Sequence, residues 1–272
     1  MTGQLTEAEA YRAILDCEPH LRLWQDRVRT HEEPERGSEL QLDDAVFPRH
    51  RISEICRYSL ATSGEHLRLA IDAIHRSNVY PGAHYTAVRG ALVGASQAVW
   101  ILSPDVPGLR QSRGHCAISE SDKYLVKHYE RALKMPGWDV AMRTRIEGQI
   151  AYMQDRRTQL ARIRSDNNSL NVTSMIEEVA RQEFTSDQAV NIVLEWTRMS
   201  SDAHVLGWGS AQRAPAGVPV PGTADDIRPL QGNLQQLAEP FIASYMLLKQ
   251  GWSLFDRRCE EPQPTRVWRS QV

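Results

Sequence analysis

Apolar residues recur at helical spacing along most of this chain, and no segment shows a convincing alternation of apolar and polar positions. The pattern predicts helices over residues 6–28, 52–75, 85–102, 121–133, 140–164, 172–181, 186–206 and 227–257. Thr6 followed by Glu9 has the spacing of a capping box at the start of the first helix. Pro19 is expected to bend this helix. The sequence therefore predicts an all-α bundle of about eight helices.

The breaks between these helices suggest how the chain is organised. Residues 31–48 are acidic and contain Pro and Gly, which indicates an exposed linker, and residues 103–119 are expected to form a loop. The Gly- and Pro-rich run 209–226 is expected to be irregular, with a short extended piece at 218–220. We expect three parts: an N-terminal helix and acidic linker (1–48), a bundle core (49–208), and an irregular loop with a C-terminal helix packed on the core (209–272).

Small residues mark the helix predicted at 85–102 as the centre of the bundle. They let neighbouring helices approach closely, at some cost in helix propensity. They are Ala87, Gly90, Ala91, Gly94, Ala95 and Ala98.

Composition indicates a folded protein in a reducing compartment. Of the 272 residues, 41% are hydrophobic and 24% are charged, which is too apolar for general disorder. The 32 basic and 34 acidic residues give a net charge of -2, so attraction for nucleic acid would have to come from a local patch. The four scattered cysteines form no CxxC pair, and no apolar run approaches a membrane span or a signal peptide. We expect reduced thiols, no membrane association and a cytoplasmic location.

Common catalytic motifs are missing from the sequence. It contains no phosphate-binding loop with its lysine, no GxGxxG after a strand, no HExxH and no GxSxG. These absences disfavour hydride transfer, redox and metal catalysis, and we expect no cofactor and no metal site.

The segment from Arg198 to Trp208 gathers the polar groups most suited to chemistry. Arg198, Ser201, Asp202 and His204 lie within two helical turns before Gly207, which is expected to end the helix. The segment resembles the motif of the HEPN superfamily of helical bundles, an Arg followed after four to six residues by a His near a helix end. Over about residues 53–208 the chain is also similar to actinobacterial helical proteins with a Ser-rich, His-Gly-Trp segment.

This resemblance implies a metal-independent endoribonuclease, or an RNA-binding protein, in phage defence or a toxin-antitoxin pair. Arg198 and His204 would be the catalytic pair, assembled across a homodimer interface, with Ser201 and Asp202 beside them. His204 would move a proton at a ribose 2′-hydroxyl or at the leaving oxygen, and Arg198 would stabilise phosphate charge. The spacing alone also matches Arg68 to His75 and Arg110 to His115, but only the match at Arg198 lies beside serines and ahead of a glycine.

A structural interpretation competes with this one. Arg198 and Asp202 could form a helix-surface ion pair and His204 could bond Ser200 or Ser201, in which case the protein would be a noncatalytic protein-protein interaction module. Arg89 sits among small apolar residues, so its charge must meet a carboxylate or reach a pocket.

A third hypothesis is a site for a small anionic ligand. It would be built from Arg89 with Arg110, Arg113 and His115 of the predicted loop. The helix at 140–164 could also carry a basic strip, which the acidic neighbours Glu147, Asp155 and Asp166 weaken; its arginines are Arg143, Arg145, Arg156, Arg157, Arg162 and Arg164.

Overall fold

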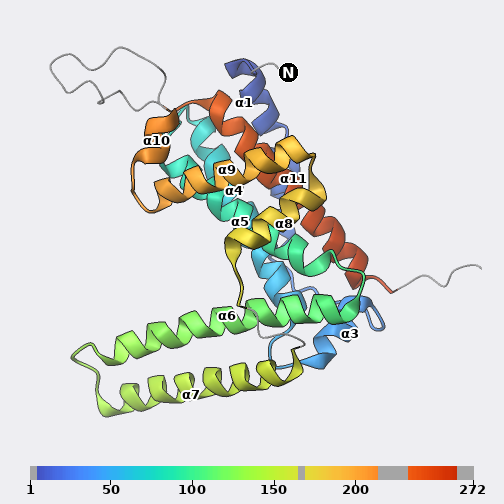
Figure 1. Ribbon diagram of the computed structural model, residues 1–272, viewed down its shortest axis with the longest axis vertical. Coiled ribbons are helices and arrows are strands. Elements are labelled where there is room, and N and C mark those ends of the chain that lie inside the picture. The colour runs from blue at the N-terminus through green and yellow to red at the C-terminus, as the bar shows by residue number, and fades with distance from the viewer. Residues whose placement is uncertain (1–4, 165–168, 214–231, 262–272) are drawn as a thin grey trace, which may run out of the picture. The chain divides into compact units, whose positions relative to one another are not determined.

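The computed structural model describes residues 5–164, 169–213 and 232–261, and every regular element in these ranges is an α-helix (Figure 1). The predicted all-α class is confirmed, although the helices are more numerous than the eight expected. They are α1 (Glu7–Leu15), α2 (Glu18–Arg27), α3 (Glu39–Val46), α4 (Ile52–His75), α5 (Ala83–Leu102), α6 (Pro107–Leu133), α7 (Val140–Ile163), α8 (Val172–Glu183), α9 (Ser186–Ala203), α10 (Trp208–Arg213) and α11 (Leu234–Cys259). The extended piece expected at 218–220 lies outside the described residues.

The chain divides into two compact units, each built from three separate segments. The first unit comprises Met1–His31, Cys56–Trp100 and Asn171–Ser253, and the second comprises Glu32–Ile55, Ile101–Leu170 and Leu254–Val272. The sequence predicted three parts that succeed one another along the chain, whereas each of these units combines segments that are far apart in the sequence.

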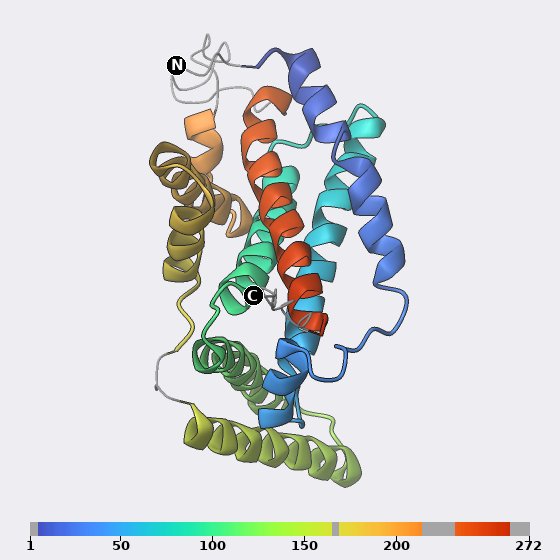
Figure 2. The ribbon, with the colours of Figure 1, turned by 90° about the vertical axis from the view of Figure 1, so that its right-hand side faces the viewer.

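Helices α4, α5 and α11 form the centre of the first unit, where α11 runs between α5 and α4 (Figure 2). Small residues permit this packing, as predicted for α5. A Cβ atom added at Gly94 would lie 2.6 Å from the carbonyl oxygen of Ser59 on α4, so only glycine allows the two backbones this distance. On α11, a Cβ at Gly251 would lie 2.6 Å from Leu60 Cδ2.

The predicted N-terminal helix is two helices. Thr6 and Glu9 do form the capping box at the start of α1, which confirms that prediction. The chain turns at Cys17, and the proline at position 19 lies in the first turn of α2, where its missing N–H costs no helical hydrogen bond. Trp24 then packs on Trp252 of α11, with ring centroids 6.4 Å apart.

Helix α9 buries one stripe and exposes the rest. Ile192, Trp196 and Met199 are buried, whereas Leu194 is 49% exposed. The buried positions follow the period of 3.6 residues, which leaves position 194 on the outer side.

In the second unit, the segment predicted to be a linker contains helix α3. Ser38 caps this helix by accepting a hydrogen bond from the Gln41 amide, and Leu40 is fully buried. The linker prediction was wrong because the acidic residues that suggested solvent exposure have partners: Asp44 accepts hydrogen bonds from Ser53, and Asp43 pairs with Arg110.

The loop predicted at 103–119 is mostly the first half of α6, which begins with Pro107 at a position that suits proline. Helix α6 then turns back into α7, and the two lie side by side as an antiparallel hairpin (Figure 1). Val126, Ile146, Met153 and Leu160 are buried in this hairpin. Asp122 and Arg156 form a buried ion pair between the two helices.

All four cysteines are buried, and none forms a disulfide bond with another. Within the described ranges, no helix is both long enough and apolar enough to cross a membrane.

Candidate functional site

The polar segment singled out by the sequence lies at the C-terminal end of α9. The helix ends at Ala203, four residues before the glycine expected to end it, and His204 is its C-cap. The amide of Leu206 donates to the carbonyl of Ser201 (2.9 Å) and that of Val205 to the carbonyl of Asp202 (3.1 Å). These two bonds define a Schellman cap, in which Val205 takes the left-handed position with φ 57°.

Replacing Val205 with glycine is expected to stabilise the protein by about 1 kcal/mol, because a side chain with a Cβ atom is strained in the left-handed conformation. Val205 is 91% exposed, so its removal loses almost no packing. Urea denaturation of the wild type, Val205→Gly and Val205→Ala would measure the effect. Alanine should give a smaller gain than glycine, and a glycine variant less stable than wild type would contradict the assignment of this cap.

The ion pairs at the end of α9 differ from those expected. Arg198 does not pair with Asp202; its Nη1 atom contacts Glu195 Oε1 at 2.6 Å. Asp202 pairs with Arg213 of α10. Helix α10 approaches closely because Gly209 has no side chain: a Cβ there would lie 2.6 Å from the carbonyl oxygen of Arg198.

His204 is not held by a serine, contrary to the structural interpretation. Ser200 Oγ donates to the Trp196 carbonyl (2.9 Å), and Ser201 Oγ accepts from the amide of Gly209 (2.8 Å). The imidazole of His204 is exposed and makes no hydrogen bond to a described residue. Because the ring is exposed, a substrate can reach it, which catalysis by His204 requires.

Arg89 of α5 contacts the same helix. Its Nε atom donates to Ser200 Oγ at 3.1 Å, and its guanidinium lies over the Trp196 ring, 4.3 Å from the centroid. No carboxylate among the described residues forms an ion pair with it, and partial burial lowers the pKa of Arg89. The salt bridge considered for this arginine is therefore absent from the described part of the chain.

Arg89 and His204 share one side of α9, whereas Arg198 is on another. Trp196, Ser200 and His204 succeed each other at intervals of four residues, so they form one stripe along the helix. Arg89 lies against the first two members of this stripe. Arg198 precedes His204 by six residues, which places the two roughly 120° apart around the helix axis.

The side of α9 that carries Glu195 and Asp202 is closed and polar. The Asp202 side chain is 1% exposed and that of Arg213 7%, and the Arg213 guanidinium lies 3.6 Å from the centroid of the Tyr85 ring. Burial raises the pKa of Glu195 and that of Tyr85. Ser201 is buried as well, so Asp202 and Ser201 are placed for structure and not for contact with a substrate.

The histidines of the other two Arg and His matches are either paired or buried. Arg68 and His75 both contact Glu18, at 2.7 Å and 2.9 Å, and the hydrogen bonds from Arg22 and Arg68 lower the pKa of Glu18 to about 2. Arg110 and His115 are both 1% exposed. Neither pair offers an exposed histidine without a protein partner.

The anion-binding loop predicted from Arg110, Arg113 and His115 is not formed, because these residues lie within α6. Arg110 pairs with Asp43 and Glu39, both at 2.7 Å. Arg113 is half-buried, and His115 packs edge-on against Phe47. Arg89 belongs to the first unit and these three to the second, and their role in ligand binding stays a prediction.

The basic strip predicted along α7 is also not continuous. Arg156 is buried and paired with Asp122, while Arg143, Arg145 and Arg162 are exposed. In the described residues, no group of three or more His, Cys, Asp or Glu side chains is arranged to hold a metal ion.

Comparison of the chain with protein-family models, with curated proteins and with solved structures gives no match. Sequence reasoning singled out His204 and Arg89 separately, but nothing in the spacing indicated that α5 would bring Arg89 to the His204 side of α9.

Proposed function

We propose that this protein is a metal-independent endoribonuclease, in which His204 transfers a proton and Arg89 binds the phosphate. The observation that carries the proposal is a partly buried arginine without a carboxylate partner on the same side of α9 as an exposed histidine. The proposal keeps the reaction that the HEPN resemblance implies, and it moves the phosphate contact from Arg198 to Arg89.

Electrostatics support this choice of arginine. The last carbonyl groups of a helix carry partial negative charge, so a phosphate beside the end of α9 needs a cation that no carboxylate neutralises. Arg198 is paired with Glu195, whereas Arg89 is held in position by neutral groups, the Trp196 ring and the Ser200 hydroxyl. Arg89 therefore keeps its full charge for an anion.

The reaction needs only groups of this site, the RNA and water. The ribose 2′-oxygen attacks phosphorus, the bond from phosphorus to the 5′-oxygen breaks, and the products carry a 2′,3′-cyclic phosphate and a 5′-hydroxyl. His204 takes the proton from the 2′-hydroxyl or gives one to the leaving oxygen, and water exchanges the other proton. Arg89 stabilises the charge that develops on the phosphate oxygens.

Cleavage of labelled single-stranded RNA in EDTA tests the proposal. We expect the wild type to cleave, and His204→Ala and Arg89→Met to reduce the rate by about 100-fold or more. Arg198→Met is the matched control, because it removes an arginine from the same helix end, and it should stay within about threefold of wild type. An RNA with a 2′-deoxyribose at the cleaved position should resist the enzyme.

Two results would overturn this assignment. A folded wild type that leaves RNA intact would exclude the reaction, and loss of activity in Arg198→Met but not in Arg89→Met would return the phosphate contact to the sequence motif. Circular dichroism of each variant separates loss of activity from loss of fold.

A noncatalytic interaction module is the second candidate, and one observation favours it. The turn after α9 exposes apolar side chains: Val205 is 91% exposed, Leu206 63% and Trp208 40%. Such a turn suits contact with a protein, including a second copy of this chain. A wild type that is dimeric by sedimentation, a monomeric Leu206→Ser variant and intact RNA with both would support this candidate.

A further inference from the structure

The α6–α7 hairpin is the basic part of the protein. Residues 107–164 contain twelve Lys and Arg and six Asp and Glu, a net charge of +6, although the whole chain has a net charge of -2. A local concentration of this sign within a slightly acidic chain indicates a surface for a polyanion.

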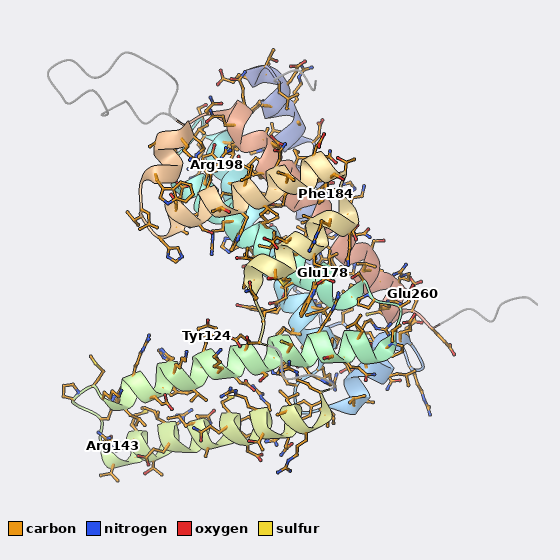
Figure 3. The ribbon with its side chains drawn as sticks, viewed as in Figure 1. Tyr124, Arg143, Glu178, Phe184, Arg198 and Glu260 are labelled. Carbon is orange, nitrogen blue, oxygen red and sulfur yellow. The ribbon has the colours of Figure 1, made fainter. Side chains whose placement is uncertain are left out.

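The two sides of α6 in the outer part of the hairpin differ. Asp122 and Val126 are buried, and Asp122 pairs with Arg156 of α7, so they mark the side that faces α7. On the opposite side, helical spacing aligns four residues that are all exposed, which we call the outer α6 face: Tyr124, Lys127, Arg131 and Lys134. Figure 3 shows Tyr124 on the side of α6 turned away from α7.

The cations of the outer α6 face are available to a ligand. Among the described residues, no carboxylate forms an ion pair with Lys127, Arg131 or Lys134. Glu130 follows Lys127 by three residues and precedes Lys134 by four, but it forms no ion pair with either, and Lys123 has its own partner in Glu120, 2.8 Å away. Tyr124 is 62% exposed, and the Lys127 ammonium lies 5.5 Å from the centroid of its ring.

We propose that the outer α6 face binds RNA, with Lys127, Arg131 and Lys134 on successive phosphates and Tyr124 stacked on a base. Cations interleaved with an exposed aromatic ring are the usual means of holding a single strand. The choice of RNA as the polyanion rests on the function proposed for the end of α9. The inference adds a second contact surface, distant in sequence from the site of cleavage.

Other occupants fit this face less well. A second copy of the hairpin would bring like charges together, which costs free energy. A helix that lies on a membrane needs a continuous apolar side, whereas the outer α6 face consists of three cations and one tyrosine.

Binding of a labelled single-stranded RNA across a salt series tests the proposal. The protein is the full chain with His204→Ala, in EDTA, so that binding is measured without cleavage. A triple variant with Lys127→Gln, Arg131→Gln and Lys134→Gln should bind about 100-fold more weakly near 0.1 M salt, and its log-log salt slope should fall by about 2. Tyr124→Leu should weaken binding by about tenfold.

The control removes three exposed cations from the first unit instead: Arg12→Gln, Arg76→Gln and Lys249→Gln. It should bind RNA within about threefold of the parent. Equal losses in both triple variants would overturn the proposal in favour of a general charge effect. Unchanged RNA binding by the α6 variant would also overturn the proposal. So would a variant that binds RNA as the parent does but binds vesicles of phosphatidylcholine and phosphatidylserine more weakly than the parent.

This test is independent of the proposed chemistry. RNA binding that depends on the outer α6 face, with no cleavage by the wild type, would leave this inference standing and remove the nuclease. Cleavage that depends on His204 and Arg89, with normal binding by the α6 variant, would do the reverse.

Discussion

Replacing Arg110 with methionine is expected to lower the free energy of unfolding by about 3–5 kcal/mol, the cost of leaving a buried charge without its partner. Arg110 is 1% exposed, and its Nε atom lies 2.7 Å from Asp43 Oδ2. Asp43 is also 1% exposed, so the variant would strand its carboxylate away from water. Urea denaturation followed by circular dichroism would measure the loss, and hydrogen exchange in α3 and α6 would localise it.

A double variant shows whether the effect belongs to this pair. Arg110→Met with Asp43→Leu removes both charges and fills the space with apolar groups, so it should recover much of the stability lost in Arg110→Met. The recovery will be incomplete, because Arg110 also contacts Glu39 at 2.7 Å and the carbonyl oxygen of Pro104 at 3.0 Å. A single variant as stable as wild type would show that this network contributes little.

This network explains why sequence reasoning misplaced the surrounding elements. A stretch with several arginines after Ser-Pro-Asp is typical of a loop, and an acidic stretch with Pro and Gly is typical of a linker. Each stretch forms a helix because the other supplies its opposite charge: Asp43 of α3 meets Arg110 of α6, and Glu39 of α3 also meets Arg258 of α11. Such pairs are 67 and 219 residues apart, and no local pattern records them.

Elements stabilised by apolar packing were easier to predict. The boundaries of α4 agree with the pattern of apolar positions, and α7 ends within one residue of its predicted range. The close approach of α5 and α4 followed from the small residues, since Gly94 lies against the backbone of Ser59. The period of the apolar positions is a local signal, so it predicts helices that bury one apolar stripe.

The candidate site was predicted only in part. Its histidine was found from the sequence, because a polar segment before a glycine marks a helix end. Its arginine was not, because Arg198 is close to His204 in the sequence, whereas Arg89 reaches α9 only through the fold, at Ser200. The outer α6 face has a signal in the sequence, since positions 124, 127, 131 and 134 are at helical spacing.

The second large effect expected is a loss of stability in mild acid that depends on His115. Burial lowers the pKa of His115 to about 4, from an ordinary value of 6.5. The unfolded chain therefore binds a proton at a pH where the folded protein does not, and stability is lost as the pH falls from 6.5 towards 4. Between pH 7 and pH 5 this single group should cost about 2 kcal/mol.

Contacts in the second unit explain the lowered pKa. The His115 side chain packs edge-on against Phe47, with ring centroids 6.0 Å apart, and its Nε2 atom is buried without a hydrogen-bond partner in the described residues. Arg164 adds a second, smaller effect in the same direction, because its charge repels a protonated imidazole. A positive charge at His115 would thus be both desolvated and repelled.

His115→Leu removes the titrating group while keeping a buried side chain of similar volume. The free energy of unfolding of wild type and variant should be measured by urea denaturation at several pH values between 7 and 4.5. Every other titrating group is shared, so the difference between the two curves isolates His115. We expect the variant to gain about 2 kcal/mol relative to wild type between pH 7 and pH 5. Parallel curves would show that His115 accepts a proton in the folded protein as readily as in the unfolded chain.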